Sequence, residues 1–272
     1  MDMLDGILKM PRQKLPRPVR PAPTIAAEYR RRLDALIEEM HRSLTYWLAA
    51  AYRAHPSVMA ADEAPATSLR AAVRRLSRRW QRRFNDAADD LARYFAQAVA
   101  DRSDLALKRA LKRGGFSVEF KLTPAARDVL GATVYENVGL IRSIAQEHLA
   151  AVEGMVMRSV AAGRDLESLS KGLQEQFGVT KRRAALIARH QNNLATASIQ
   201  RVRQIEIGVT DAVWLHSGGG RHPRPSHVKA GRDRVRYSVK EGWWDPDERK
   251  HVLPGELINC RCTSIPIVPG FS

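Results

Sequence analysis

The protein has 272 residues, of which 44% are apolar and only 6% aromatic, and it carries a formal net charge of +16. A chain of this length and apolar content can bury a substantial core, which excludes wholesale disorder. The basic excess indicates a polyanionic partner, either a nucleic acid or an acidic protein surface. No apolar run approaches 18 residues, so we expect no membrane partner. The N-terminal residues also lack the features of a signal peptide.

Residues 1–23 are predicted to form an extended arm. Residues 11–23 contain five prolines and four basic residues, and proline both fixes φ and removes a backbone hydrogen-bond donor. We expect the arm to make few contacts with its own chain. It could serve as a linker, or lie along a neighbouring subunit or a phosphate backbone.

Residues 24–208 are predicted to form a helical body, because apolar residues recur at spacings of three and four. Between the second and third helices, residues 116–122 alternate between apolar and polar and are predicted as one edge strand. The predicted helices run from Thr24 to about His55, from Thr67 or Ser68 to Gly114, from Thr123-Pro124 to about Ala162, from Asp165 to Gly178, and from Thr180 to about Gly208.

The second predicted helix carries a strongly basic face. Seven arginines fall between residues 70 and 83, and residues 66–113 hold 13 basic against five acidic residues. Like charges at helical spacing repel each other, so this face needs a counter-charge. DNA phosphates would supply it without reading sequence, and so would an acidic groove on a protein. The candidate nucleic-acid-binding or partner-binding residues are Arg74, Arg75, Arg78, Arg79, Arg82 and Arg83.

Residues 209–272 differ in character and predict a compact α+β domain. They are rich in Gly, Pro and other turn residues. Short strands are predicted within 209–216, 233–239 and 262–268, and the tryptophan pair at 243–244 is predicted to lie in an exposed turn. The predicted fold class is therefore a mainly α helical body with a small C-terminal α+β domain.

Cys260 and Cys262 are the only cysteines of the chain. They cannot form a disulfide framework, and a bridge across one residue would be strained. With His227 they could bind zinc, which prefers thiolate and imidazole ligands. The alternative is two buried packing thiols, because Cys-x-Cys in a strand points its side chains to opposite faces. The candidates for a fourth ligand are His222, His216, Asp233 and His251.

In either case, the Pro254-Gly255 turn should bring the cysteines back across the domain. We expect at least one of them to face the segment from Arg224 to His227. If the cysteines only pack, Asn259 and Arg261 would hold this end of the chain through hydrogen bonds to the same segment.

This region resembles the phage Mu F-like family of minor head proteins, also called the head morphogenesis family. The resemblance covers about residues 180–268, and the chain departs from it at His190-Gln191, where many members have Thr-Glu, and at Gly220, where many have an acid. The pattern runs from an Ala-Arg helix through a tryptophan strand, an Arg-x-x-His turn and a glycine to Pro-Gly and Asn-Cys-Arg-Cys. Its residues in this chain are Arg189, Trp214, Arg224, His227, Gly231, Pro254, Gly255, Asn259, Cys260, Arg261 and Cys262.

The resemblance implies a structural protein, built in few copies into a phage capsid near the portal. It implies the portal or major capsid protein as partner, and non-specific contact with packaged DNA. We also expect no small-molecule substrate, and no cofactor beyond a possible structural zinc. The expected location is the virion, in the head interior or at the portal vertex, and the host cytoplasm during assembly.

Two other functions stay open at this point. The first is a metal-dependent DNA-processing enzyme of the nuclease kind, which would need carboxylates to hold its metal. Acids in the last domain are few and follow no catalytic spacing, so we predict no catalytic residues and no enzyme activity. The second is a basic nucleic-acid-binding regulator, for which the sequence shows no helix-turn-helix signature.

Overall fold

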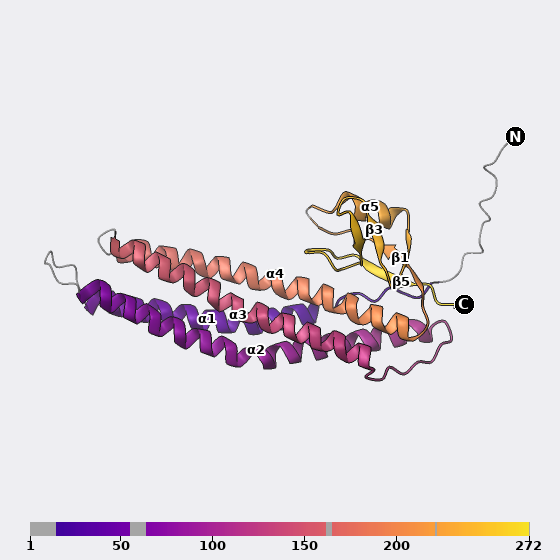
Figure 1. Cartoon of the computed structure of the whole chain (residues 1–272), viewed down its shortest axis with the longest axis horizontal. Helices are drawn as coiled ribbons and strands as arrows, with labels where there is room; N and C mark the ends of the chain where they lie inside the picture. The colour runs from indigo at the N-terminus through magenta and orange to yellow at the C-terminus, as the bar shows by residue number, and fades with distance from the viewer. Residues whose placement is uncertain (1–14, 55–63, 162–164, 221, 272) are drawn as a thin grey trace. The chain divides into compact units, whose positions relative to one another are not determined.

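The protein is mainly helical in its computed structural model, which describes residues 15–54, 64–161, 165–220 and 222–271. Helices make up 68% of it, followed by a small region of antiparallel strands, so the predicted fold class is confirmed (Figure 1). None of the described helices is long and apolar enough to cross a membrane. The elements are α1 (Pro23–Ala54), α2 (Ala64–Lys112), α3 (Pro124–Ala161), α4 (Leu166–Glu206), β1 (Asp211–Leu215), α5 (Pro225–Arg232), β2 (Arg236–Ser238), β3 (Trp243–Asp245), β4 (Lys250–Val252) and β5 (Thr263–Pro266).

The first three long helices begin close to the predicted residues. α1 begins at Pro23, one residue before the predicted start, and α2 begins at Ala64. α3 begins at Pro124, directly after the predicted cap. The hydroxyl of Thr123 accepts a hydrogen bond from the main-chain N–H of Ala126 at 3.1 Å. This satisfies a donor that the first turn leaves unpaired, and proline suits the first helical position.

The last two predicted helices are in fact one. Asp165 caps α4 as expected, because its carboxylate accepts two main-chain N–H groups of the first turn at 2.9 and 3.1 Å. The helix then continues through Gly178 and Thr180. The Thr180 hydroxyl donates to the carbonyl of Gln176 at 2.9 Å, so it caps nothing. One glycine costs a helix only about 1 kcal/mol, which tertiary packing readily offsets.

Contacts divide the chain into two compact units, each with its own core. The helical unit consists of residues 22–98 and 130–192. The mixed unit consists of the described part of residues 1–21, with residues 99–129 and 193–272. These boundaries fall inside α2, α3 and α4, whereas the boundary suggested by composition lies between α4 and β1.

The helical unit is built from parts of α1 to α4 that lie side by side (Figure 1). A row of hydrogen-bonded polar side chains crosses its apolar core. Tyr29 donates its hydroxyl hydrogen to Asn137 Oδ1 at 3.0 Å, and Asn137 Nδ2 donates to Gln191 Oε1 at 2.9 Å. Gln191 Nε2 donates to Glu136 Oε1 at 2.8 Å. Because the buried Tyr29, Asn137 and Gln191 satisfy one another and the exposed Glu136 ends the row, these side chains can fix the alignment of α1, α3 and α4 without leaving a buried polar atom unpaired.

The helical unit also buries a histidine. His148 is 1% exposed, and its Nδ1 lies 2.8 Å from the Thr180 hydroxyl oxygen. Its Nε2 is buried without a hydrogen-bond partner among the described residues. Burial, with a smaller contribution from the nearby His41, lowers the pKa of His148 to about 4. This imidazole is therefore neutral at physiological pH.

The mixed unit contains two small antiparallel sheets. One has the order β2-β1-β5, with Val213 of β1 opposite both Arg236 and Ile265, and the other is the hairpin β3-β4. The three predicted strands are confirmed as β1, β2 and β5. The hairpin replaces the turn predicted at Trp243 and Trp244, and α5 replaces the turn predicted before His227. Strands of three residues are too short for alternation to reveal them.

Trp214 of β1 lies at the centre of the mixed unit and is fully buried. Its ring centroid lies 4.9 Å from that of His227, 5.2 Å from that of Trp243 and 5.9 Å from that of Tyr237. Aromatic rings at these separations pack favourably and fill a large volume. The largest side chain of this small core therefore forms one wall around His227.

Residues 116–122 do not form the predicted edge strand. Phe116, Val118 and Phe120 are partly buried against the core of the mixed unit, and the residues between them are exposed. The described chain nevertheless gives this segment no place in either sheet. The Phe116 ring instead stacks on Phe271, with centroids 6.1 Å apart. The alternation of apolar and polar residues therefore predicted correctly that one side of the segment is buried. It predicted wrongly that the segment pairs with a strand.

The described part of the N-terminal arm packs on the mixed unit. Residues 15–21 have no regular secondary structure, as their prolines dictate. Val19, however, is only 8% exposed and belongs to the same core as Leu107 and Leu111. The expectation of few contacts is therefore wrong for this segment, and the rest of that prediction concerns residues 1–14, outside the described residues.

Candidate functional site

The structure brings the three candidate metal ligands together. His227 lies in α5, and its Nδ1 is 3.5 Å from Cys260 Sγ and 3.8 Å from Cys262 Sγ. The three ligand atoms all lie within 4.8 Å of one another, and all three side chains are buried. We call these residues the sulfur–imidazole cluster. At least one cysteine was expected to face this segment, and both do.

The two sulfurs share one side because residues 260–262 precede β5 instead of lying in it. The chain bends before them at Gly255, with φ of +88°, and at Asn259, with φ of +62°. Glycine and asparagine tolerate this left-handed region better than other residues do. The argument that Cys-x-Cys points its side chains to opposite faces is therefore wrong here, because it assumes a strand.

Asp245, at the end of β3, is the functional neighbour that the sequence analysis did not single out. It is fully buried, and its Oδ2 lies 3.1 Å from His227 Nε2. Its Oδ1 accepts the main-chain N–H of Asp247 at 2.9 Å. A carboxylate fixed in this way sets the orientation of the imidazole and the nitrogen that carries its hydrogen. No sequence signal indicates the pairing of Asp245 with His227. The two residues lie 18 positions apart, and they meet only because β3 and β4 form a hairpin that was not predicted.

The electrostatics of the cluster favour one thiolate. The hydrogen bond from Cys262 holds the pKa of Cys260 well below its ordinary value, despite burial and with help from His227. The same contact raises the pKa of Cys262. Burial alone would lower the pKa of His227, but the hydrogen bond to Cys260 and the charges of Cys260 and Asp245 outweigh it, so this pKa is raised.

None of the four residues considered as a fourth ligand joins the cluster within the described chain. His216 Nδ1 accepts the main-chain N–H of Gly218 at 3.2 Å. The ring of His251 packs against Trp244, with centroids 5.5 Å apart. The remaining two candidates, His222 and Asp233, are exposed.

Other motif residues hold the surroundings of the cluster. Arg224 donates from Nε to the Glu248 carboxylate at 3.1 Å and from Nη1 to the carbonyl of Ile258 at 3.2 Å. Asn193, the last residue of the helical motif 187–193, donates from Nδ2 to the carbonyl of Cys260 at 3.0 Å. These bonds tie α4 and the loop before α5 to the segment that carries the cysteines. Pro254 is buried, whereas Arg189 and Arg261 are exposed.

Gly231 of α5 is required by close packing. A Cβ atom at this position would lie 2.3 Å from His216 Cβ and 2.7 Å from the His216 main-chain nitrogen. Both separations are far shorter than a van der Waals contact, and one of the opposing atoms belongs to the backbone. The motif glycine therefore lets α5 approach the end of β1, which positions His227 beside Trp214.

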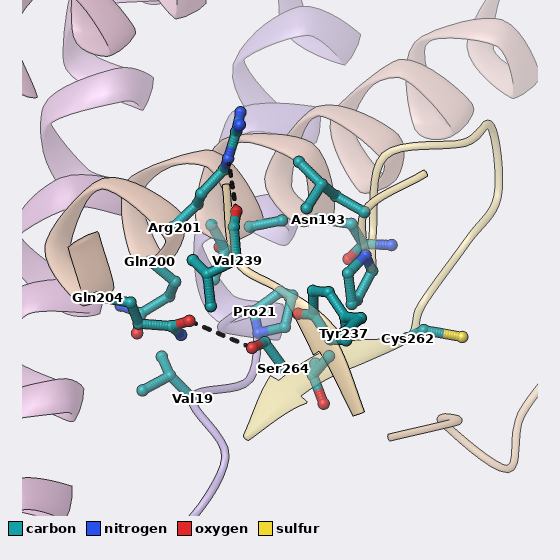
Figure 2. A pocket seen from close by; sticks show the side chains of 15 residues that line it. Val19, Pro21, Asn193, Gln200, Arg201, Gln204, Tyr237, Val239, Cys262 and Ser264 are labelled. Atoms are coloured by element: carbon teal, nitrogen blue, oxygen red, sulfur yellow. Dashed lines mark hydrogen bonds between the residues drawn. The ribbon is translucent and has the colours of Figure 1, made fainter. Parts of the chain in front are cut away.

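A small pocket lies in the mixed unit (Figure 2). Arg201 Nε donates across it to the carbonyl of Val239 at 3.0 Å, and the Ser264 hydroxyl donates to Gln204 at 3.3 Å. Figure 2 shows the sulfur of Cys262 directed away from the other lining side chains. The pocket has a volume of about 30 Å³. It can hold about one water molecule, so it is no substrate site.

The basic face of α2 lies in the helical unit. All six of its candidate arginines are exposed. One ion pair of this face is seen in the described residues, between Arg83 and Glu39 at 4.0 Å, and both of its side chains are largely in solvent. Arg75 and Arg79 also border a groove of about 450 Å³, whose floor is largely alanine and which includes the half-exposed Trp47.

Comparisons with known proteins agree with the motif residues. Residues 150–265 match the family model described as Phage Mu protein F like protein. A Haemophilus influenzae protein described as uncharacterized is 28% identical over 152 residues, which cover 56% of this chain. The match covers 32% of that curated relative, so the chain spans about a third of its length. No solved structure matches. The match begins about 30 residues earlier than the motifs indicated. Over residues 150–265 the chain is therefore similar to the Phage Mu F-like family, as its motifs predicted.

Proposed function

We propose that the protein is a minor head component of a tailed phage or prophage and acts in head morphogenesis. The match over residues 150–265 carries this proposal. The phage head morphogenesis family is generally structural, which fits an assembly role better than an enzymatic one. The enclosed cluster and the water-sized pocket of the mixed unit also favour a structural role over a DNA-processing enzyme.

The protein would dock on the portal or the major capsid protein, during assembly in the host cytoplasm and later in the virion. The groove beside Trp47 supports such docking, because an apolar floor beside Arg75 and Arg79 suits an apolar segment with acidic flanks. The same unit would touch packaged DNA through the basic face of α2.

The contact with DNA follows from the geometry of that face. Residues 74–83 cover about 13 Å of helix at 1.5 Å per residue. Six exposed guanidinium groups along this length repel one another, and phosphates would relieve the repulsion through charge-assisted hydrogen bonds. Such contacts read charge and spacing rather than bases, so the binding would be independent of sequence.

Salt-dependent binding to a duplex of random sequence tests the contact. The variant Arg74→Gln/Arg75→Gln/Arg78→Gln/Arg79→Gln should flatten the slope of log affinity against log salt by about 0.9 for each phosphate that the protein no longer neutralises. The matched control replaces four exposed basic residues near the end of the same helix, and it removes the same charge. It consists of Arg102→Gln, Arg109→Gln, Lys112→Gln and Arg113→Gln.

The control should keep a steeper slope than the variant of the basic face. Equal slopes for the two variants would show that net charge, and not this face, attracts DNA. A wild-type slope in the first variant would assign the arginines to protein docking, to be followed by binding measurements with portal and coat proteins.

A further inference from the structure

The sulfur–imidazole cluster has the dimensions of a metal site. A tetrahedral zinc ion with bonds of about 2.3 Å to sulfur and about 2.05 Å to nitrogen sets its sulfur and nitrogen ligands about 3.6 Å apart. The two distances from His227 Nδ1 are 3.5 Å to Cys260 Sγ and 3.8 Å to Cys262 Sγ. Both sulfur–nitrogen separations therefore already match those of zinc ligands, and the two sulfurs lie within 4.8 Å of each other.

A hydrogen bond to the imidazole accounts for only one of the two sulfurs. A neutral imidazole nitrogen offers a single lone pair, so it accepts one hydrogen well. Two sulfurs nevertheless converge on the one Nδ1 atom of His227, inside a core where each is at most 5% exposed. Two packing thiols would not need to share an imidazole nitrogen, whereas two ligands of a common ion would.

The second ring nitrogen is held as in a metal-binding histidine. The Asp245 carboxylate lies 3.1 Å from Nε2 of His227 and is itself anchored by a main-chain N–H. In neutral imidazole this places the hydrogen on Nε2 and leaves the lone pair of Nδ1 facing the sulfurs. Histidines that bind metals almost always donate their other ring hydrogen to a carboxylate, a carbonyl or a water molecule.

The sulfurs also receive main-chain donors. The N–H of Gly255 points at Cys260 Sγ over 3.4 Å, and a main-chain hydrogen bond from Ser217 reaches Cys262. Donors of this kind favour sulfur in its anionic form. Two thiolates, one neutral imidazole and one divalent cation sum to zero charge, so the occupied site would add no net charge to the core beyond that of the Asp245 carboxylate.

We propose that Cys260, Cys262 and His227 bind one thiophilic divalent cation, Zn²⁺, with Asp245 as the residue that positions the imidazole. No fourth His, Cys, Asp or Glu belongs to the cluster in the described chain, so a water molecule completes the tetrahedron. The ion would join α5 to the segment that leads from the turn at Gly255 into β5, within a unit whose strands have three to five residues.

Cys260, His227 and Asp245 also follow the order of a nucleophile, a base and an orienting acid. Both reacting atoms are enclosed, since Cys260 is 4% and His227 2% exposed, and a second thiol occupies the space beside the nucleophile. A catalytic thiol must meet its substrate and react readily with small electrophiles. The accessibility of the thiols therefore distinguishes the two possibilities.

Cobalt binding to the full chain tests the proposal. Protein freed of metal by a chelator should bind one equivalent of Co²⁺, with the visible absorption of tetrahedral cobalt and the near-ultraviolet charge-transfer absorption of cobalt–thiolate bonds. One equivalent of Zn²⁺ should displace the cobalt and protect both thiols from a disulfide reagent. The variant Asp245→Asn should keep one equivalent but lower the affinity about 10- to 100-fold.

Two further variants complete the experiment. Cys260→Ser/Cys262→Ser should lose the charge-transfer absorption, whereas His251→Gln, which alters a histidine outside the cluster, should keep it. The wild-type measurements need no variant, so a double variant that fails to fold leaves the test intact. Absence of the charge-transfer absorption in the wild type, thiols that remain reactive with Zn²⁺ present, or unchanged affinity in Asp245→Asn would overturn the proposal.

Discussion

Among the described residues, each of the two units buries one histidine, and the pKa values of these two histidines shift in opposite directions. His148 in the helical unit is 1% exposed, and His227 in the mixed unit is 2% exposed. The pKa of His148 is lowered to about 4, mainly by burial, because its close polar neighbour is the uncharged Thr180 hydroxyl. The pKa of His227 is raised, because Cys260 and Asp245 outweigh the same effect.

Burial alone therefore says little about what a histidine does. A histidine that meets a hydroxyl and apolar side chains is a neutral part of the core. A histidine held between a carboxylate and two sulfurs can carry a positive charge when it is protonated, or bind a cation when it is neutral. The difference resides in the neighbours, and in the mixed unit the carboxylate comes from β3 and both sulfurs from the segment before β5.

The largest expected effect on stability comes from removing the indole ring of Trp214, which packs against His227. Trp214→Ala should lower the free energy of unfolding by about 3–5 kcal/mol, because it leaves a large cavity in a small core. Trp244→Ala is the matched control, since this side chain is 53% exposed and packs mainly against His251. Urea unfolding followed by circular dichroism measures both. Similar losses in the two variants would show that Trp214 does not organise the mixed unit.

The second prediction concerns the contribution of His148 to the pH dependence of stability. Its folded pKa of about 4 lies below its ordinary value of 6.5, so the unfolded chain binds the proton more tightly. This contribution is fully present above pH 6.5 and is lost as the pH falls toward 4, for a total of about 3 kcal/mol. His148→Asn should therefore show a shallower acid dependence than the wild type. Parallel stability curves between pH 4 and 6.5 would contradict the assignment of His148 as a buried neutral imidazole.

The smallest effects come from two glycines of opposite character. Gly231→Ala should destabilise the protein by about 1–3 kcal/mol, because its Cβ would meet the backbone of His216. Gly139→Ala, on the exposed face of α3 with no atom within 4 Å of the added Cβ, should stabilise it by about 0.5–1 kcal/mol. Thermal unfolding measures the sign of each change. A shared sign would mean that the close approach of α5 to β1 is not a real constraint.

The sequence predicts the helical unit better than the mixed unit, for a physical reason. Helical stripes and the caps at Thr123 and Asp165 are local, so a single window contains both cause and effect. The continuity of α4 through Gly178 depends instead on packing against other helices, which overrides the local signal.

In the mixed unit the decisive contacts join distant residues. The motif identified His227, Cys260 and Cys262, but their convergence depends on a left-handed bend at Asn259 that no periodicity reveals. Asp245 was missed because its role exists only once the β3-β4 hairpin has formed. The exposure of the arginines on α2, by contrast, follows from helical spacing alone.

The division of the chain also sets an order of events during synthesis. The described helical unit is complete in sequence at residue 192, but the mixed unit needs residues 193–272 as well as Val19 and Leu107. At roughly 5–20 residues per second, a ribosome needs about 4–16 s for those last 80 residues. During this interval Val19 and Leu107 lack the residues that cover them in the folded protein. The growing chain therefore exposes an aggregation-prone apolar surface until Cys260 and its neighbours have been synthesised.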